Sequence, residues 1–206
     1  MPTSPSDLHV RAIPDTDLDA AADLLGRGMA DNPLHLAVYR GDEASRACRH
    51  GRLMRTLLRS SPFVQLEGVH SADALVGVAA WAPPGTCQPT LSARLRLVGR
   101  AVTFGPGTAS RLLVWKRGWG DHDPAAPHVH LGPVSVDRHL RGRGIGTLLL
   151  TRHVRRLDVS GADGYLETDR PEAVGFYARF GYVVVAQADV LGTPCWFMRR
   201  RARETS

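Results

Sequence analysis

The stretch from His128 to Leu150, HVHLGPVSVDRHLRGRGIGTLLL, most constrains what this chain can fold into. Its first part, up to Val136, alternates apolar and other residues in the manner of a β-strand. A short polar joint, 137–140, leads into Arg-Gly-Arg-Gly-Ile-Gly at 141–146, and the apolar run 147–150 then begins a helix. The order of these pieces predicts a strand, a glycine-rich turn and a helix.

Such a turn is suited to binding an anion. The first N–H groups of a helix have no partner inside the helix, and the helix dipole adds positive potential there. Gly142, Gly144 and Gly146 have no Cβ, so a phosphate can approach the backbone closely. Arg141 and Arg143 add positive charge beside it. The expected ligand therefore carries a pyrophosphate or a similar group.

Three phosphate-binding patterns can be compared with this turn. A Walker loop requires a lysine after its glycines, and none follows here. A dinucleotide-binding fingerprint requires Gly-x-Gly-x-x-Gly directly after a strand, whereas this chain has Gly-x-Gly-x-Gly four residues beyond the strand and no second βαβ half. The pattern Arg/Gln-x-x-Gly-x-Gly/Ala is matched by Arg141, Gly144 and Gly146.

This third pattern resembles motif A of the GNAT superfamily of acyl-CoA N-acyltransferases. A second match, AVGFYARFGY at 173–182, resembles a further signature of the family, Ala-Ile-x-Phe-Tyr-x-x-x-Gly-Phe/Tyr. The resemblance is specific over 128–200. It implies an α/β fold with a mixed, mostly antiparallel central sheet, splayed in a V and flanked by helices. We expect one domain over 1–206, with a helical insertion at about 86–127 and a disordered tail at 201–206.

The resemblance also implies how acetyl-CoA, or another short acyl-CoA, is bound as co-substrate. In the family, the strand before motif A donates backbone N–H groups to the pantetheine arm and the thioester carbonyl. The corresponding residues here are Val134, Ser135 and Val136. The pyrophosphate is expected to lie on Arg141, Gly142, Arg143, Gly144, Ile145, Gly146 and Thr147.

Tyr177 matches the family position whose phenol protonates the leaving thiolate. A phenol is protonated near neutral pH and can donate that proton. The alternative is that Tyr177 only packs a helix against the sheet, as we expect of Phe176. One departure concerns Arg170, which stands seven residues before Tyr177 where the family often has Asn. It puts the usual side-chain contact to the pantetheine arm in doubt.

Several residues compete for the role of general base. His130 stands on the strand where histone-acetylating relatives carry a glutamate, and imidazole can accept a proton near neutral pH. A hydrogen-bonded strand histidine is the equally weighted alternative. Glu67 and Glu167 are rivals, and Glu167 can equally orient the loop before Tyr177. A covalent route through Cys87 or Cys195 is not expected, because direct attack is typical of the family.

The remaining sequence predicts the elements around this unit. Asp31-Asn32-Pro33 ends the first helix. Gly105-Pro106-Gly107 separates the two helices of the insertion. The expected strands are 8–13, 63–70, 74–81, 165–168, 182–190 and 194–200, and the expected helices are 18–27, 43–59, 91–103, 109–118, 144–160 and 171–180.

Composition excludes several other classes of protein. The chain has 206 residues, 43% of them hydrophobic, and no apolar run long enough to span a bilayer. Its start lacks the features of a secretory signal, so a cytoplasmic location with reduced thiols is expected. The net charge of +6 accompanies no nucleic-acid-binding motif. The three cysteines lack metal spacing, and the loop cluster Asp121-His122-Asp123 is expected to be solvated, so no metal is predicted.

Together these features predict an N-acetyltransferase. We expect it to transfer an acetyl or short acyl group to a primary amine of a small molecule or peptide, by direct attack in a ternary complex. The partners are then acyl-CoA and the amine, with neither nucleic acid nor membrane, and a homodimer is left open. Two alternatives are a non-catalytic acyl-CoA-binding sensor and a basic protein associated with nucleic acid.

Overall fold

A seven-stranded mixed sheet forms the centre of the molecule in the computed structural model, which describes residues 8–202. The strand order is β1-β2-β3-β4-β5-β7-β6, and every neighbouring pair is antiparallel except β4 and β5. This confirms the predicted mixed, mostly antiparallel sheet. The strands are β1 (Leu8–Ala12), β2 (Gln65–Ser71), β3 (Ala74–Ala82), β4 (Val129–Val136), β5 (Gly164–Thr168), β6 (Val183–Val190) and β7 (Thr193–Arg200).

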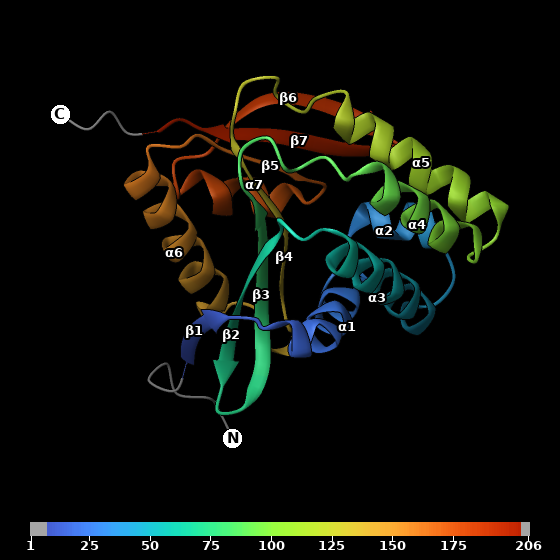
Figure 1. Ribbon diagram of the computed structural model, residues 1–206, viewed down its shortest axis with the longest axis horizontal. Coiled ribbons are helices and arrows are strands. Elements are labelled where there is room, and N and C mark those ends of the chain that lie inside the picture. The colour runs from blue at the N-terminus through green and yellow to red at the C-terminus, as the bar shows by residue number, and fades with distance from the viewer. Residues whose placement is uncertain (1–7, 203–206) are drawn as a thin grey trace.

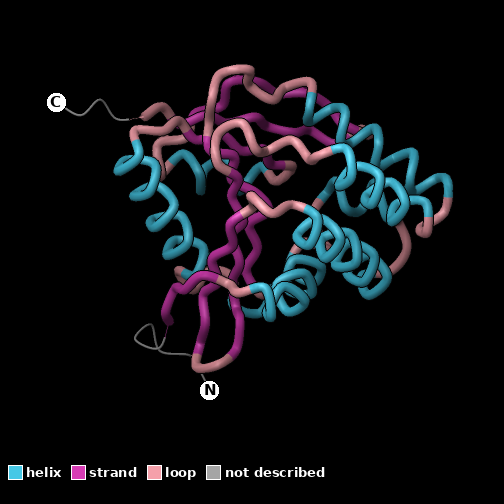
Figure 2. Tube along the Cα trace, in the orientation of Figure 1, coloured by secondary structure: helices cyan, strands magenta, loops and turns pink. Residues whose placement is uncertain are grey.

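Helices flank the sheet, as Figures 1 and 2 show: α6 lies on one side, and α1 to α5 gather on the other. The helices are α1 (Leu18–Gly28), α2 (Pro33–Tyr39), α3 (Glu43–Ser60), α4 (Leu91–Val102), α5 (Pro106–Gly120), α6 (Ile145–Ser160) and α7 (Pro171–Ala178). Short 3-10 helices occupy Asp15–Asp17 and Arg138–Leu140.

Alternation along β3 divides the core between the two faces of the sheet. Side chains of successive strand residues point to opposite faces. Val78 accordingly packs in the apolar cluster that contains Leu24 and Leu25 of α1, while Ala79 belongs to the cluster that contains Leu149 of α6. The central sheet is therefore covered on both sides, which holds the strand ends in fixed positions.

The parallel pair β4 and β5 separates soon after it begins. Val129 pairs with Gly164 and His130 with Tyr165, and the pairing ends there although β4 continues to Val136. Beyond His130, the edge of β4 that faces β5 has no neighbouring strand. This is the opening that the predicted V-shaped splay required.

The helical insertion is present before β4, with two differences from the expected elements. Helix α5 begins at Pro106, where we expected a break, because proline fits the first helical turn, whose N–H groups have no intrahelical partner anyway. Helix α2 was not predicted. Helix α1 ends at Gly28, and Asn32 adopts an extended conformation directly before Pro33. Pro33 then begins α2, because its fixed φ suits the first helical position.

The C-terminal end is partly anchored. The Ala202 N–H donates a hydrogen bond to Asp163 Oδ1 at 2.7 Å. The disorder expected of 201–206 stays a prediction. Residues 203–206 lie outside the described part of the chain. Within residues 8–202, none of the helices combines the length and apolar character needed to cross a membrane.

Candidate active site

A cavity of about 910 Å³ lies where β4 and β5 separate. The predicted site residues line it, except Arg143, which is exposed beside it, and the candidate base Glu67. The lining residues among those predicted are Val134, Ser135, Val136, Arg141, Gly142, Gly144, Ile145, Gly146, Thr147, His130, Glu167 and Tyr177. Segments separated by almost 50 residues in sequence thus contribute to one space.

The glycine-rich turn presents unpaired backbone groups to this cavity. Gly142 and Gly144 have φ of 79° and 81°, a left-handed conformation that favours glycine. Gly144 is the N-cap of α6, and the first helical hydrogen bond runs from Leu148 N to Gly144 O at 3.0 Å. The N–H groups of 145–147 precede that bond and therefore have no acceptor inside the helix.

The Arg141 side chain is already engaged. It forms two hydrogen bonds with Asp31, at 2.7 and 2.9 Å, and a third with the carbonyl of Gly28. The hydrogen bond from Arg141 is the main cause that lowers the pKa of Asp31 to about 2. Arg141 thus ties the turn to the end of α1, and much of its charge is neutralised there. Among the described residues, Arg143 forms no ion pair.

Arg170, the departure from the family pattern, lies in the same network. Its Nη1 lies 3.4 Å from Asp31 Oδ1 and 3.1 Å from Asn32 Oδ1, and Arg170 also pairs with Glu172. The sequence indicates Asp31 only as part of a helix break. No sequence pattern points to its place in this network, because its partners are more than 100 residues away.

Tyr177 is on α7, and its ring lies against those of Phe176 and Tyr182 at centroid distances of 5.4 and 6.2 Å. Burial raises the pKa of Tyr177 to about 12, and the charge of Asp169 acts in the same direction. The phenol therefore keeps its proton at neutral pH and lines the cavity in the form that can donate it.

Two of the three candidate bases form a pair. His130 Nε2 and Glu167 Oε2 are 2.9 Å apart, with the Glu167 side chain 5% exposed. Burial acts to lower the pKa of His130, but the Glu167 charge and the hydrogen bonds around the ring outweigh it and raise the value to about 10. The third candidate, Glu67, is bound by Arg152 and Arg156 of α6 and does not line the cavity.

Helices α3 and α5 supply another part of the cavity wall. Their contributions are mainly apolar and aromatic, with Met54, Leu57, Trp115 and Trp119 among them. His50 lies deeper in the same wall, where burial lowers its pKa to about 3 and keeps it neutral. This part of the cavity can accept an uncharged carbon skeleton beside the reacting centre.

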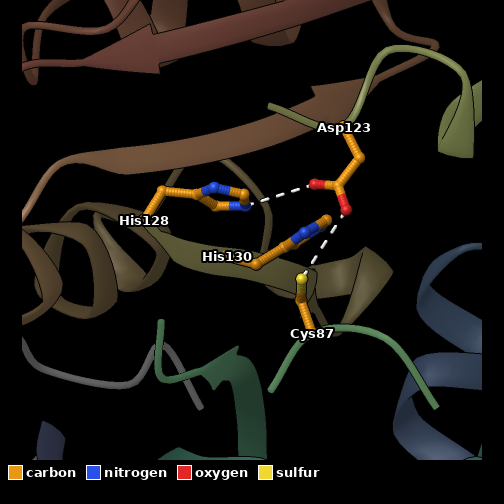
Figure 3. A group of neighbouring side chains, drawn as sticks. All are labelled: Cys87, Asp123, His128 and His130. Atoms are coloured by element: carbon orange, nitrogen blue, oxygen red, sulfur yellow. Dashed lines mark hydrogen bonds and ion pairs between the residues drawn. The ribbon is translucent and has the colours of Figure 1, made fainter. Parts of the chain in front are cut away.

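Figure 3 shows a cluster beside His130 that the sequence did not predict. Asp123 and His128 come from the loop before β4, and Cys87 comes from the loop before α4. Cys87 lies on the cavity wall, although its position in the sequence suggested no role beyond a discounted covalent route. The i, i+2 spacing of His128 and His130 on the predicted strand was the one available signal, because it places both side chains on the same face, but nothing in the sequence connects them with Cys87.

The fold and the cavity define an α/β protein with a glycine-rich turn at one end of an open strand pair. Residues 107–184 match the family model for the acetyltransferase (GNAT) domain. Over these residues the chain is therefore similar to a GNAT acetyltransferase domain.

Solved structures agree with this fold. A structure described as histone acetyltransferase HPA2 and related acetyltransferase from Corynebacterium glutamicum has a TM-score of 0.73 at 22% identity, over 97% of this chain and 99% of that one. A structure of a mutant agmatine N-acetyltransferase in its apo form has a TM-score of 0.63 at 14% identity, over 95% of this chain and 99% of that one. The structure of YncA from Salmonella typhimurium with its cofactor acetyl-CoA has a TM-score of 0.55 at 15% identity, over 97% of this chain and 96% of that one.

Proposed function

We propose that this protein transfers an acetyl or short acyl group from acyl-CoA to a primary amine. The observation that carries the proposal is the cavity itself. It joins the unpaired N–H groups at the start of α6 to the open edge of β4 and to the Tyr177 side chain.

The coenzyme would lie along two sets of backbone donors. Its pyrophosphate would bind the amides of 145–147, where the helix dipole and the absence of side chains on the glycines favour an anion. The pantetheine arm and the thioester carbonyl would lie against Val134, Ser135 and Val136 on the unpaired edge of β4. Acetyl-CoA in the Salmonella typhimurium relative supports this choice of ligand.

The reaction would then be a direct attack. The amine nitrogen bonds to the thioester carbonyl carbon, and the carbon–sulfur bond breaks. The amine proton passes to the Glu167 carboxylate, which His130 holds in place through a hydrogen bond, and the Tyr177 phenol donates a proton to the departing sulfur. Backbone donors on β4 stabilise the negative charge that develops on the carbonyl oxygen.

The acceptor would enter between α3 and α5. The wall formed by Met54, Leu57, Trp115 and Trp119 favours an amine with an apolar or aromatic part. A small molecule or a peptide end meets this description. The agmatine N-acetyltransferase relative is described as acting on a small amine, which supports the small-molecule case.

A CoA-release assay tests the proposal. Acetyl-, propionyl- and succinyl-CoA would each be mixed with panels of aliphatic and aromatic amines, polyamines and peptides. We expect amine-dependent release of CoA and the matching N-acyl product by mass spectrometry. Tight acyl-CoA binding without turnover, together with identical ligand binding by Tyr177→Phe, would instead identify a non-catalytic sensor.

A further inference from the structure

Four side chains that can bind a metal converge beside the cavity. Cys87, Asp123, His128 and His130 each offer one ligand atom, and all four atoms lie within 4.8 Å of one another. Figure 3 shows the side chains pointing toward a common centre from three segments of the chain. These segments are the loop before α4, the loop after α5, and the start of β4.

Hydrogen bonds determine which nitrogen of His128 faces this centre. His128 Nδ1 lies 2.9 Å from the carbonyl oxygen of Ala126. A carbonyl only accepts hydrogen bonds, so Nδ1 carries a proton, and Nε2 is the nitrogen that presents a lone pair in the neutral ring. Nε2 lies 3.2 Å from Asp123 Oδ1, and neither atom has a hydrogen-bond partner. Since the His128 side chain is only 6% exposed, these two acceptors face each other away from solvent.

The same reasoning applies to His130. Its Nε2 donates to the Glu167 carboxylate at 2.9 Å, which leaves Nδ1 on the side of the cluster. His130 Nδ1 is buried without a hydrogen-bond partner, with Cys87 beside the ring. A buried polar atom without a partner is unfavourable, and three such atoms here surround one point.

Asp123 is oriented by a neighbour outside the cluster. Gln88 Nε2 donates to Asp123 Oδ2 at 2.7 Å, so Oδ1 is the oxygen left to face His128. Cys87 Sγ lies 3.7 Å from Asp123 Oδ2. A thiol hydrogen bond to Oδ2 would account for Cys87 but would leave the other three atoms unpartnered.

We propose that Cys87, Asp123, His128 and His130 bind one zinc ion. Zinc would displace the ligand protons, and the resulting thiolate, carboxylate and two neutral imidazoles form a donor set that zinc prefers, whose two negative charges balance the ion. Zinc bond lengths give a tetrahedron whose N···O and S···O edges are about 3.3–3.6 Å. The observed separation of 3.2 Å between His128 Nε2 and Asp123 Oδ1 is close to the N···O edge.

The surroundings also resemble those of zinc sites in general. A histidine ligand usually donates its other N–H to a carboxylate or a backbone carbonyl, which fixes the ring and makes it a better ligand. His130 does so to Glu167, and His128 does so to Ala126. Both orienting contacts are present before any ion binds.

The ion would connect the two ends of the helical insertion to the sheet. Cys87 and Asp123 are 36 residues apart and enclose α4 and α5 between them. With all four positions filled by protein, the site is of the closed, structural type. Its effect on the reaction is indirect: it fixes the insertion that forms one wall of the cavity, and it positions Glu167 through His130.

Cobalt substitution tests this site directly. The full chain, freed of any histidine tag, would be reduced, stripped with a chelator and titrated with Co²⁺. We expect about one equivalent to bind, with the strong visible bands of tetrahedral cobalt and a near-ultraviolet band from thiolate coordination. Zinc should displace the cobalt and raise Tm. A titration that produces neither band, with Tm unchanged by zinc, would overturn the proposal in favour of protonated histidines in the cluster.

Matched variants locate the ligands. Cys87→Ser should abolish the thiolate band, whereas Cys48→Ser, at an exposed cysteine, should leave it unchanged. Asp123→Asn should lower the cobalt affinity at least tenfold, whereas Asp121→Asn, two residues away in the same loop, should not. Far-UV circular dichroism confirms that each variant is folded. A thiolate band retained by Cys87→Ser would contradict the assignment.

Discussion

At the level of single residues, Tyr177 carries the most specific chemical prediction. Replacing it with Phe removes one hydroxyl and leaves the ring packing. If the phenol protonates the leaving thiolate, kcat should fall by about 100-fold or more, with the KM for acetyl-CoA little changed. Steady-state kinetics with the best amine from the CoA-release assay measures both constants.

Tyr182→Phe is the matched control. Tyr182 is also a buried tyrosine of the second motif, but its hydroxyl lies 2.9 Å from His153 Nε2. This change should lower Tm because it leaves a buried imidazole without its partner, and kcat should stay near the wild-type value. Equal kcat in wild type and Tyr177→Phe would exclude Tyr177 as the proton donor.

Asp31 gives a pH-dependent prediction. Its pKa is about 2 in the folded protein against an ordinary value of 3.8, chiefly because Arg141 donates hydrogen bonds to it. The folded state therefore binds this proton more weakly. The resulting stability is fully present above about pH 3.8 and is lost as the pH falls toward 2. Asp31→Asn should lower Tm at neutral pH, and the difference from wild type should shrink in acid. A difference that stayed constant between neutral pH and pH 3 would contradict this account.

Arg141 illustrates what the sequence could predict about single residues. Its position in motif A was visible, and the expectation that it lies at the site agrees with the cavity lining. Its salt bridge to Asp31 was not visible, because only the fold brings two residues 110 positions apart together. A motif indicates which residues meet a ligand, but it does not indicate which of them already have partners.

At the level of elements, the packing of α1 against β4 depends on Gly28. A Cβ at this position would lie 2.0 Å from Ser135 Oγ and 3.1 Å from the Val136 carbonyl oxygen. Gly28→Ala should therefore lower the free energy of unfolding by about 1–3 kcal/mol, because α1 must move away from the strand. Urea denaturation measures the change.

Two companion variants make this a test of contact rather than of helix propensity. Gly99 lies in α4, where an added Cβ would meet no other atom within 4 Å, so Gly99→Ala should raise the free energy of unfolding by up to about 1 kcal/mol. The double variant Gly28→Ala with Ser135→Ala should recover part of the loss. Additive effects of the two changes would show that the two residues do not interact.

The elements themselves were largely predictable, and the exceptions have a common cause. Helix α3 and strands β2, β3 and β7 follow strong periodic patterns, and their ends agree with expectation within one or two residues. The two exceptions, α2 and the start of α5, both concern proline. Pro33 and Pro106 each begin a helix, and sequence alone does not distinguish a proline that breaks a helix from one that starts it.

At the level of the whole molecule, the opening between β4 and β5 determines where the site can be. The sequence predicted it only through the family resemblance, because strand pairing depends on the register of segments distant in sequence. The proposed zinc site shows the same limit. Its ligands come from two loops and from the start of β4, and Cys87 and Asp123 are 36 residues apart, so the sequence does not show that the four residues meet.

The central claim is that the start of α6 binds the diphosphate of the coenzyme, and Thr147 allows a direct test. This exposed residue lies in the first turn of α6, so a carboxylate there stabilises the helix but repels a bound phosphate. Acetyl-CoA binding by Thr147→Glu and its neutral match Thr147→Gln can be compared by titration calorimetry. We predict that Thr147→Glu raises Kd at least about tenfold over Thr147→Gln, with Tm unchanged or higher. Equal affinities for the two variants would contradict the claim.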